Sequence, residues 1–229
     1  MPSAHPFAIH RERIEHHQNP QPQYQHARLT PLTTPLQRDF FLPTPDRVAR
    51  ALLGKLIVRI LDGEHLTGRI VETEAYFGLD DPAAHAYAGE TARNRILFGP
   101  PGHAYVYFIY GMHYCLNASC EPPGHAGCVL IRALEPLSGL ATMARLRRQP
   151  ASRPHLLTSG PGKLCQALAI TRADSNGSDL TDPNASLFFA DDGFRPAQIA
   201  VTPRIGISKA ADHPARFVIP HSKFLSRAL

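Results

Sequence analysis

The sequence has few cysteines and no long apolar run, and these absences narrow the class of protein. Its 229 residues include four cysteines, and no two of them form a CxxC pair. We therefore expect free thiols that pack as small apolar side chains, not a disulfide framework. No apolar run reaches the ~20 residues that cross a bilayer, and the first residues lack the pattern of a signal peptide. These features predict a protein that is not secreted and does not bind membranes, with a cytoplasmic (nucleoid) location in a bacterium or a nuclear one in a eukaryote.

Motifs for nucleotides and metals are also missing. The segment 159–163, SGPGK, has the glycines and lysine of a phosphate loop but not its spacing, and no Ser or Thr follows Lys163. A nucleoside triphosphate site is therefore not expected, although a glycine-rich helix entry with a lysine can bind one backbone phosphate. The spacing of the histidines in residues 1–36 matches no closed metal site, so we expect no bound metal there.

Residues 1–36 differ in composition from the rest of the chain. They hold five of the 13 histidines and six of the 22 prolines, with little periodic apolar content. Such a segment cannot bury enough surface to offset the entropy of ordering. The composition predicts a disordered tail over residues 1–36 and one domain over residues 37–229.

The charge is moderately basic. Lys and Arg number 24 against 19 Asp and Glu, which gives a net charge of +5 and a sequence pI of about 9.2. A polyanionic partner is compatible with this excess, but many basic proteins bind no nucleic acid.

Hairpins with helices between them are the main secondary-structure pattern. Thr44, Pro45 and Asp46 start a short helix that Gly54 ends. Apolar runs predict strands, Asp62-Gly63 predicts a tight hairpin turn, and two further segments have helical patterns. Antiparallel hairpins combined with helices indicate an α+β fold, a single mixed domain with an antiparallel β-sheet core and flanking helices. The expected strands cover residues 55–60, 66–76, 104–110, 113–119, 128–134, 186–189 and 216–219, and the expected helices 137–148 and 163–170.

One predicted strand places carboxylates beside an aromatic ring. Alternate residues of a strand share a face, so Glu72, Glu74 and Tyr76 project together. The spacing alone favours a solvated strand face over a reactive site.

The second hairpin concentrates aromatic residues. Five of the 18 Phe and Tyr residues fall within residues 105–114. A buried strand pair explains most of them, but not Tyr110 at the lip of a turn beside Met112. An exposed aromatic residue next to methionine can form a wedge that enters base steps from the minor groove.

Isolated polar residues give further candidates. Asn117 and Arg132 each interrupt an apolar strand, which requires a structural partner or a function. If Arg132 lies near Glu74, it would keep that carboxylate ionised, as a general base requires. His85 and His103 lie in predicted loops, where ordinary surface histidines are common.

Several motifs, taken in order and spacing, resemble the alkyladenine (3-methyladenine) DNA glycosylase family. The similarity runs from about Phe40 to near the C-terminus and is densest between Val71 and Leu168. The chain departs from the family at residues 86–90, AYAGE, where it has no arginine, so phosphate contacts are not predicted from this loop. The matching segments are 71–76 (VETEAY), His85, 93–95 (RNR), 105–112 (YVYFIYGM), Asn117, 129–136 (VLIRALEP) and 159–168 (SGPGKLCQAL).

The resemblance implies a role for each matching residue. Glu74 would be the general base, with Arg132 beside the attacking water. Asn117 would crowd the 2-amino group of normal guanine. The other implied roles are a base pocket of Tyr76, His85 and Tyr107, DNA intercalation by Tyr110 with Met112, and DNA backbone contacts from Arg93, Arg95 and Lys163.

The activity that the resemblance implies is base excision without metal or cofactor. A monomer would flip an alkylated or deaminated purine out of double-stranded DNA and hydrolyse its N-glycosidic bond, leaving an abasic site. Two alternatives stay open, a non-catalytic minor-groove protein that binds lesions and a glycosidase of free nucleosides. Release of a base from a lesion duplex distinguishes them.

Overall fold

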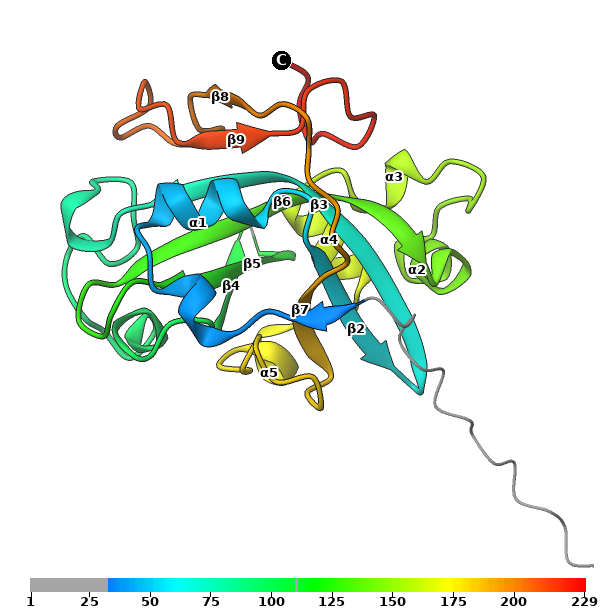
Figure 1. The fold of residues 1–229 in the computed structure, drawn as a ribbon, viewed down its shortest axis with the longest axis horizontal. Helices are drawn as coiled ribbons and strands as arrows, with labels where there is room; N and C mark the ends of the chain where they lie inside the picture. Colours follow the sequence, from blue (N-terminus) through cyan, green and yellow to red (C-terminus); the bar gives the residue numbers. More distant parts are fainter. Residues whose placement is uncertain (1–32, 110) are drawn as a thin grey trace, which may run out of the picture.

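Figure 1 shows the computed structural model of the chain, which describes residues 33–109 and 111–229. The strands are β1 (Thr34–Pro35), β2 (Leu56–Leu61), β3 (Glu64–Tyr76), β4 (Ala104–Ile109), β5 (His113–Cys120), β6 (Gly127–Ser138), β7 (Leu187–Asp191), β8 (Ala200–Thr202) and β9 (Arg216–Val218). The α-helices are α1 (Pro45–Leu52), α2 (Leu140–Arg147), α3 (His155–Thr158), α4 (Pro161–Ala167) and α5 (Arg172–Ser175). Three 3₁₀ turns are η1 (Arg38–Phe41), η2 (Gly78–Asp80) and η3 (Arg95–Phe98).

All strands belong to one antiparallel sheet with β3 near its centre. The main path runs β1-β7-β2-β3-β6-β5-β4, and β9 pairs with both β3 and β8. β3 is long enough to pair with β2 near its start and with β9 near its end, while β6 runs along its other side. This arrangement confirms the predicted α+β class, a single mixed domain built on an antiparallel sheet.

The turns of two hairpins lie where the sequence predicted them. Asp62 and Gly63 both have positive φ and join β2 to β3 in a two-residue turn, the geometry that matches the twist of paired strands. β4 and β5 also pair directly, with Ile109 opposite His113. Their connection spans residues 110–112, so the turn lies where the sequence predicted it.

Helices cover both faces of the sheet. α1 lies in front of β3 in Figure 1, and α4 is in front of the sheet in the view from behind. The Thr73 hydroxyl donates a 2.9 Å hydrogen bond to the Ala49 carbonyl of α1. Since Glu74 follows Thr73 in the strand, its side chain points away from α1.

The main core fills the space between these helices and the sheet. α1 contributes Val48 and Leu52, and α4 contributes Leu164 and Cys165 to the same cluster. All four cysteines are free and buried, which confirms that they pack as apolar side chains. Within the described residues, no helix is both long and apolar enough to cross a membrane.

Several element boundaries differ from the sequence prediction. α4 begins at Pro161, two residues earlier than expected, because proline fits the first helical turn. β6 extends to Ser138, so α2 starts later than predicted. β1 lies inside the range predicted as a tail, where Leu36 also donates its N–H to the Phe189 carbonyl. The prediction of disorder for residues 1–32 lies outside the described residues.

Gly78 lies two residues after the end of β3 and allows a close turn. Its φ is +60°, and an added Cβ would overlap the His125 carbonyl oxygen. Gly78→Ala should lower the free energy of unfolding by about 3 kcal/mol through backbone strain and overlap. Gly63→Ala is the matched control, because its φ is +81° but an added Cβ has open space around it; we expect a loss of only about 1 kcal/mol. Urea unfolding of both variants checks this, and equal losses would contradict it.

Candidate active site

A cavity of about 370 Å³ lies between the ends of the central strands, the β4–β5 hairpin and the segment after β8. A volume in this range is typical of sites that hold a small organic molecule. Aromatic and apolar side chains form most of the wall, together with Pro161 of α4 and residues 205–207. The structure brings together five residues that the sequence singled out: Tyr76, His85, Tyr107, Asn117 and Arg132 line this cavity.

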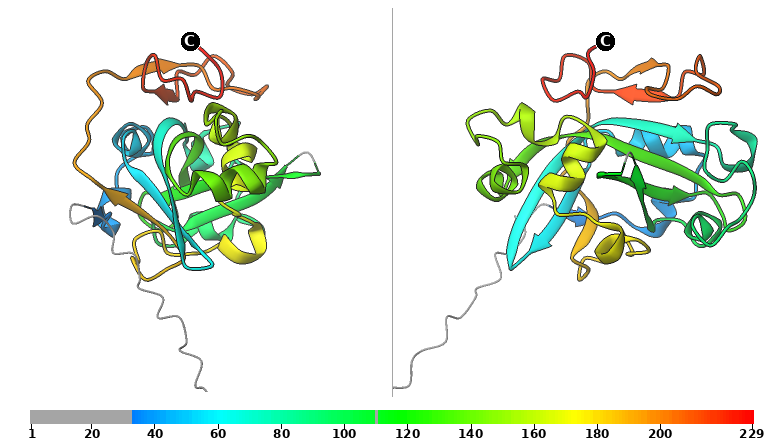
Figure 2. Two further views of the ribbon diagram at one scale, coloured as in Figure 1. Left: turned by 90° about the vertical axis from the view of Figure 1, so that its right-hand side faces the viewer. Right: turned by 180° about the vertical axis from the view of Figure 1, so that it is seen from behind.

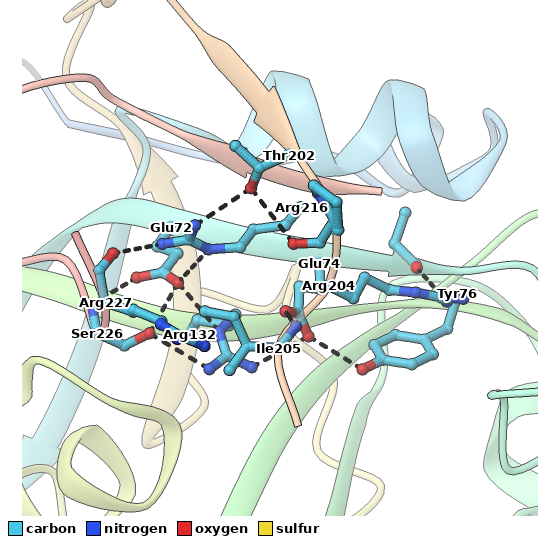
Figure 3. A network of polar contacts seen from close by, with 12 residues as sticks. Glu72, Glu74, Tyr76, Arg132, Thr202, Arg204, Ile205, Arg216, Ser226 and Arg227 are labelled. Atoms are coloured by element: carbon cyan, nitrogen blue, oxygen red, sulfur yellow. Dashed lines mark hydrogen bonds and ion pairs between the residues drawn. The ribbon is translucent and has the colours of Figure 1, made fainter. Parts of the chain in front are cut away.

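Glu74 is fully buried and contacts three residues of the cavity wall (Figure 3). Its Oε2 accepts hydrogen bonds from the Tyr76 hydroxyl at 3.0 Å and from Arg132 Nη1 at 3.1 Å. Its Oε1 accepts the backbone N–H of Ile205 at 2.7 Å. Three donors from three different segments therefore hold this carboxylate in one orientation.

The environment of Glu74 makes its carboxylate more basic than an exposed one. Burial raises the pKa of its carboxyl group, and this effect outweighs the opposing effects of Arg132, the Ile205 N–H and the Tyr76 hydroxyl. The net pKa lies above the ordinary value for glutamate. A raised pKa makes the ionised carboxylate a better proton acceptor.

Arg132 is the charged partner of this carboxylate. It lies on β6, nearly buried, and its Nε also donates to Glu72 at 3.0 Å. Burial alone would lower the pKa of Arg132, but Glu74 and Glu72 more than offset that effect, so the pKa is raised. The condition named in the sequence analysis, that Arg132 lies near Glu74, is therefore met.

Aromatic rings form the outer part of the wall. The His85 and Tyr107 rings meet edge to face, with centroids 4.4 Å apart. His85 Nδ1 is 2.9 Å from the Tyr105 hydroxyl, which fixes the imidazole. Partial burial and the Arg93 guanidinium lower the pKa of His85, so the imidazole is neutral at pH 7.

Asn117 faces the cavity from β5. Its Nδ2 donates a 3.1 Å hydrogen bond to the carbonyl of Tyr105, its cross-strand partner. This bond orients a side chain that is otherwise buried in an apolar strand.

The segment that covers Tyr76, which includes Arg204 and Ile205, was not predicted from the sequence as part of the site. Arg204 lies 4.7 Å from the centre of the Tyr76 ring and pairs in a bidentate manner with Asp81, both being buried. It also donates to the Ala75 carbonyl. The next residue, Ile205, supplies the N–H that Glu74 accepts. The only local signal was an arginine in an otherwise apolar context, which does not identify its partner.

Other predicted residues lie outside the cavity wall. Arg93 and Arg95 are exposed, and Arg93 lies 5.8 Å from the centre of the Tyr107 ring. Met112 is 70% exposed at the β4–β5 turn, and Lys163 is exposed on α4. His103 hydrogen-bonds the Pro100 carbonyl, away from the cavity. The prediction for Tyr110 falls outside the described residues.

Comparison with known proteins gives a consistent set of relatives. Residues 39–223 match the family described as methylpurine-DNA glycosylase (MPG). A protein of Koribacter versatilis named "Putative 3-methyladenine DNA glycosylase" is 54% identical over 192 residues, 84% of this chain and 93% of the relative. Proteins with the same name from Rhodopseudomonas palustris and Methanocella arvoryzae are 49% and 47% identical, covering 88% and 84% of this chain and 91% and 96% of the relatives.

The buried Asp81–Arg204 pair should stabilise the fold in a pH-dependent way. Burial raises the pKa of Asp81, but hydrogen bonds from Arg204 and from the Ala83 N–H outweigh this, so the pKa is lowered. A lowered folded-state pKa contributes stability that is present above the unfolded-state pKa and is lost as the pH falls through the folded-state value.

Asp81→Asn should therefore cost about 3 kcal/mol at pH 7, because it leaves Arg204 buried without its counter-charge, and the difference from the parent should shrink toward pH 3. Urea unfolding at several pH values measures this. The control Arg195→Gln removes the ion pair between a largely exposed arginine and Asp191, and its free energy of unfolding should stay close to that of the parent. A loss for Asp81→Asn that does not change with pH would rule out the charge-based account.

Proposed function

The chain belongs to the methylpurine-DNA glycosylase family, and from this premise we propose that Glu74 is the general base with which it hydrolyses the N-glycosidic bond of damaged purines. It is a DNA repair enzyme, a DNA glycosylase of the 3-methyladenine class, and its substrate is DNA. The observation that carries the proposal is the buried carboxylate of Glu74 behind an aromatic cavity, held by Arg132, Tyr76 and Ile205.

The reaction starts with extrusion of the damaged nucleotide. A glycosylase cannot reach C1′ in a stacked duplex, so the nucleotide leaves the helix at a cost of a few kcal/mol, which damage reduces. The cavity of about 370 Å³ receives the purine between Tyr76 and the rings of His85 and Tyr107. Electron-rich faces favour a purine made cationic by alkylation at N3 or N7.

Bond cleavage then balances as a hydrolysis. The C1′–N bond breaks, its electron pair leaves with the purine, and an alkylated cationic purine departs as a neutral base. Water adds to C1′ of the oxocarbenium-like sugar, and Glu74 accepts the proton that this water loses. The negative charge of Glu74 also stabilises the cationic sugar. The product is an intact strand with an abasic site, because no amine acts as the nucleophile.

Two further features support rejection of normal guanine and contact with the DNA backbone. Asn117, fixed by the Tyr105 carbonyl, crowds the 2-amino group of normal guanine. The exposed cations Arg93, Arg95 and Lys163 contact backbone phosphates, which position the duplex without reading its sequence. A deaminated purine such as hypoxanthine lacks the 2-amino group and fits the same pocket.

The β4–β5 turn serves as the wedge. Met112 is exposed there, and Tyr110 precedes it in sequence. Insertion of an aromatic side chain into the base stack replaces the extruded base and prevents its return.

Glu74→Gln tests the role of the base. It keeps the size of the side chain but cannot accept the proton, so base release in single turnovers should fall at least about a hundredfold, while binding of the lesion duplex persists. The control Glu64→Gln changes an exposed residue at the start of β3 and should act like the parent. The assay measures release of 7-methylguanine, hypoxanthine or ethenoadenine from duplexes.

Four outcomes contradict the proposal. Near-parental release by Glu74→Gln removes the assigned base. Strand nicking that borohydride traps on the protein shows an amine nucleophile. Binding without release by the parent indicates a lesion-binding protein, and release from free 3-methyladenosine but not from duplexes indicates a nucleoside glycosidase.

Tyr110→Ala tests the wedge. Loss of the ring should weaken lesion-duplex binding and the flipping step by roughly tenfold, about 1.4 kcal/mol, the worth of one stacked base, with less effect on bond cleavage. Phe194→Ala is the control, because it removes an exposed aromatic ring that packs under Arg69. Stopped-flow fluorescence of a base analogue beside the lesion reports flipping; unchanged flipping in Tyr110→Ala contradicts the wedge.

A further inference from the structure

Glu72 is a second buried carboxylate on β3, and the hydrolysis described above does not use it. It is fully buried and is not part of the cavity wall. It precedes Glu74 by two residues and shares its face of the strand, where both side chains point toward Arg132 (Figure 3). A buried charge of this kind is costly unless donors surround it.

Four donors satisfy Glu72. Its Oε1 accepts Arg132 Nε at 3.0 Å, Arg216 Nε at 2.7 Å and the Ser226 hydroxyl at 2.7 Å. Its Oε2 accepts the Ser226 N–H at 2.6 Å. Arg216 is held in turn by the Arg227 carbonyl at 2.6 Å. The carboxylate is therefore fixed by β6, β9 and the segment that carries Ser226.

These contacts divide the Arg132 guanidinium between two carboxylates. Nε donates to Glu72, Nη1 donates to Glu74, and Nη2 donates to the Ser226 hydroxyl at 3.3 Å. A guanidinium without these side partners would turn to bind Glu74 through two nitrogens, the preferred geometry of an arginine–carboxylate pair. Glu72 and Ser226 prevent that turn.

The charges of the cluster also indicate that Glu72 influences the basicity of Glu74. Glu72 and Glu74 balance Arg132 and Arg216, and the other groups that face Glu74 are the Tyr76 hydroxyl and the neighbouring Arg204, which Asp81 neutralises. Loss of the Glu72 charge would leave two guanidiniums for one carboxylate. Glu74 would then be a weaker base and would present less negative charge to the sugar.

We propose that Glu72 is a positioning residue that holds Arg132 shared between the two carboxylates and so keeps Glu74 basic and negatively charged toward the reacting sugar. This inference rests on the proposed function of Glu74. It extends the active site beyond the cavity wall to Glu72, Arg216 and Ser226.

The pH profile of base release tests the inference. Glu72→Gln keeps an oxygen acceptor for Arg132 but removes the charge, so its acid-side midpoint in single turnovers on a 7-methylguanine duplex should fall by about one pH unit. The maximal rate should fall by about tenfold, less than the hundredfold or more that loss of the acid–base group itself causes. Glu72→Asp keeps the charge, and its midpoint should stay within ~0.3 unit of the parent even where its rate is reduced.

A second variant, for which we expect the midpoint to shift in the opposite direction, keeps the inference testable even if Glu72→Gln folds poorly. Arg216→Gln removes one positive charge and lets Glu72 bind Arg132 more strongly, so its midpoint should rise. The control Asp192→Asn removes the carboxylate that pairs with Arg69, near the other end of β3, and should leave the midpoint unchanged. A parental midpoint in both Glu72→Gln and Arg216→Gln, or shifts of the reversed sign, overturns the inference and leaves a structural role only.

A measurement without DNA separates this inference from the proposed function. Carbon-13 NMR titration of the Glu74 carboxyl, assigned by its loss in Glu74→Gln, should show the same downward shift in Glu72→Gln. If the shift occurs but the parent releases no base from any lesion duplex, the coupling stands and the proposed function fails. If the parent releases base but the Glu74 titration does not respond to Glu72→Gln, the coupling fails and the function stands.

Discussion

Removal of the Glu74 carboxylate from water is the constraint on which the site depends. A buried carboxylate loses its hydration, and only well-placed donors can offset that cost. β3 places Glu74 at the centre of the sheet, where β6 supplies Arg132 and the segment after β8 supplies the Ile205 N–H. The same burial that costs stability raises the pKa of the carboxyl group. Burial of Glu74 therefore lowers the stability of the fold and at the same time increases the basicity of the carboxylate.

The segment that closes the cavity relies on a second buried pair. Asp81 fixes Arg204, and Arg204 in turn packs against the Tyr76 ring and places Ile205 beside Glu74. The Asp81–Arg204 pair therefore holds in place both Tyr76 of the cavity wall and the Ile205 N–H that Glu74 accepts. Because this pair is buried and bidentate, the wall is already formed in the free protein, which reduces the ordering cost of binding.

Local sequence patterns identified seven of the nine strands of the described residues, and the family resemblance identified much of the cavity wall. Neither could identify partners that lie far away in the chain. Asp62-Gly63 fixed a hairpin because its turn geometry is local. The alternation of Glu72, Glu74 and Tyr76 gave the correct face of β3, yet spacing alone did not separate a solvated face from a buried site. Motif resemblance made that distinction for Glu74. Arg204 and Ser226 carried no local signal, since their roles come from contacts with Asp81 and Glu72 across more than 100 residues.

The long sequence separation of these partners also determines when the site can form during synthesis and folding. The hydrogen bonds from Ile205 to Glu74 and from Ser226 to Glu72 join residues 131 and 154 positions apart. Contacts this distant form only after long loops close, and β3 is synthesised well before either partner. A growing chain on the ribosome can form the β2–β3 hairpin but has no ordered environment for its glutamates. The complete site therefore forms only in a chain that has been made and folded through residue 226.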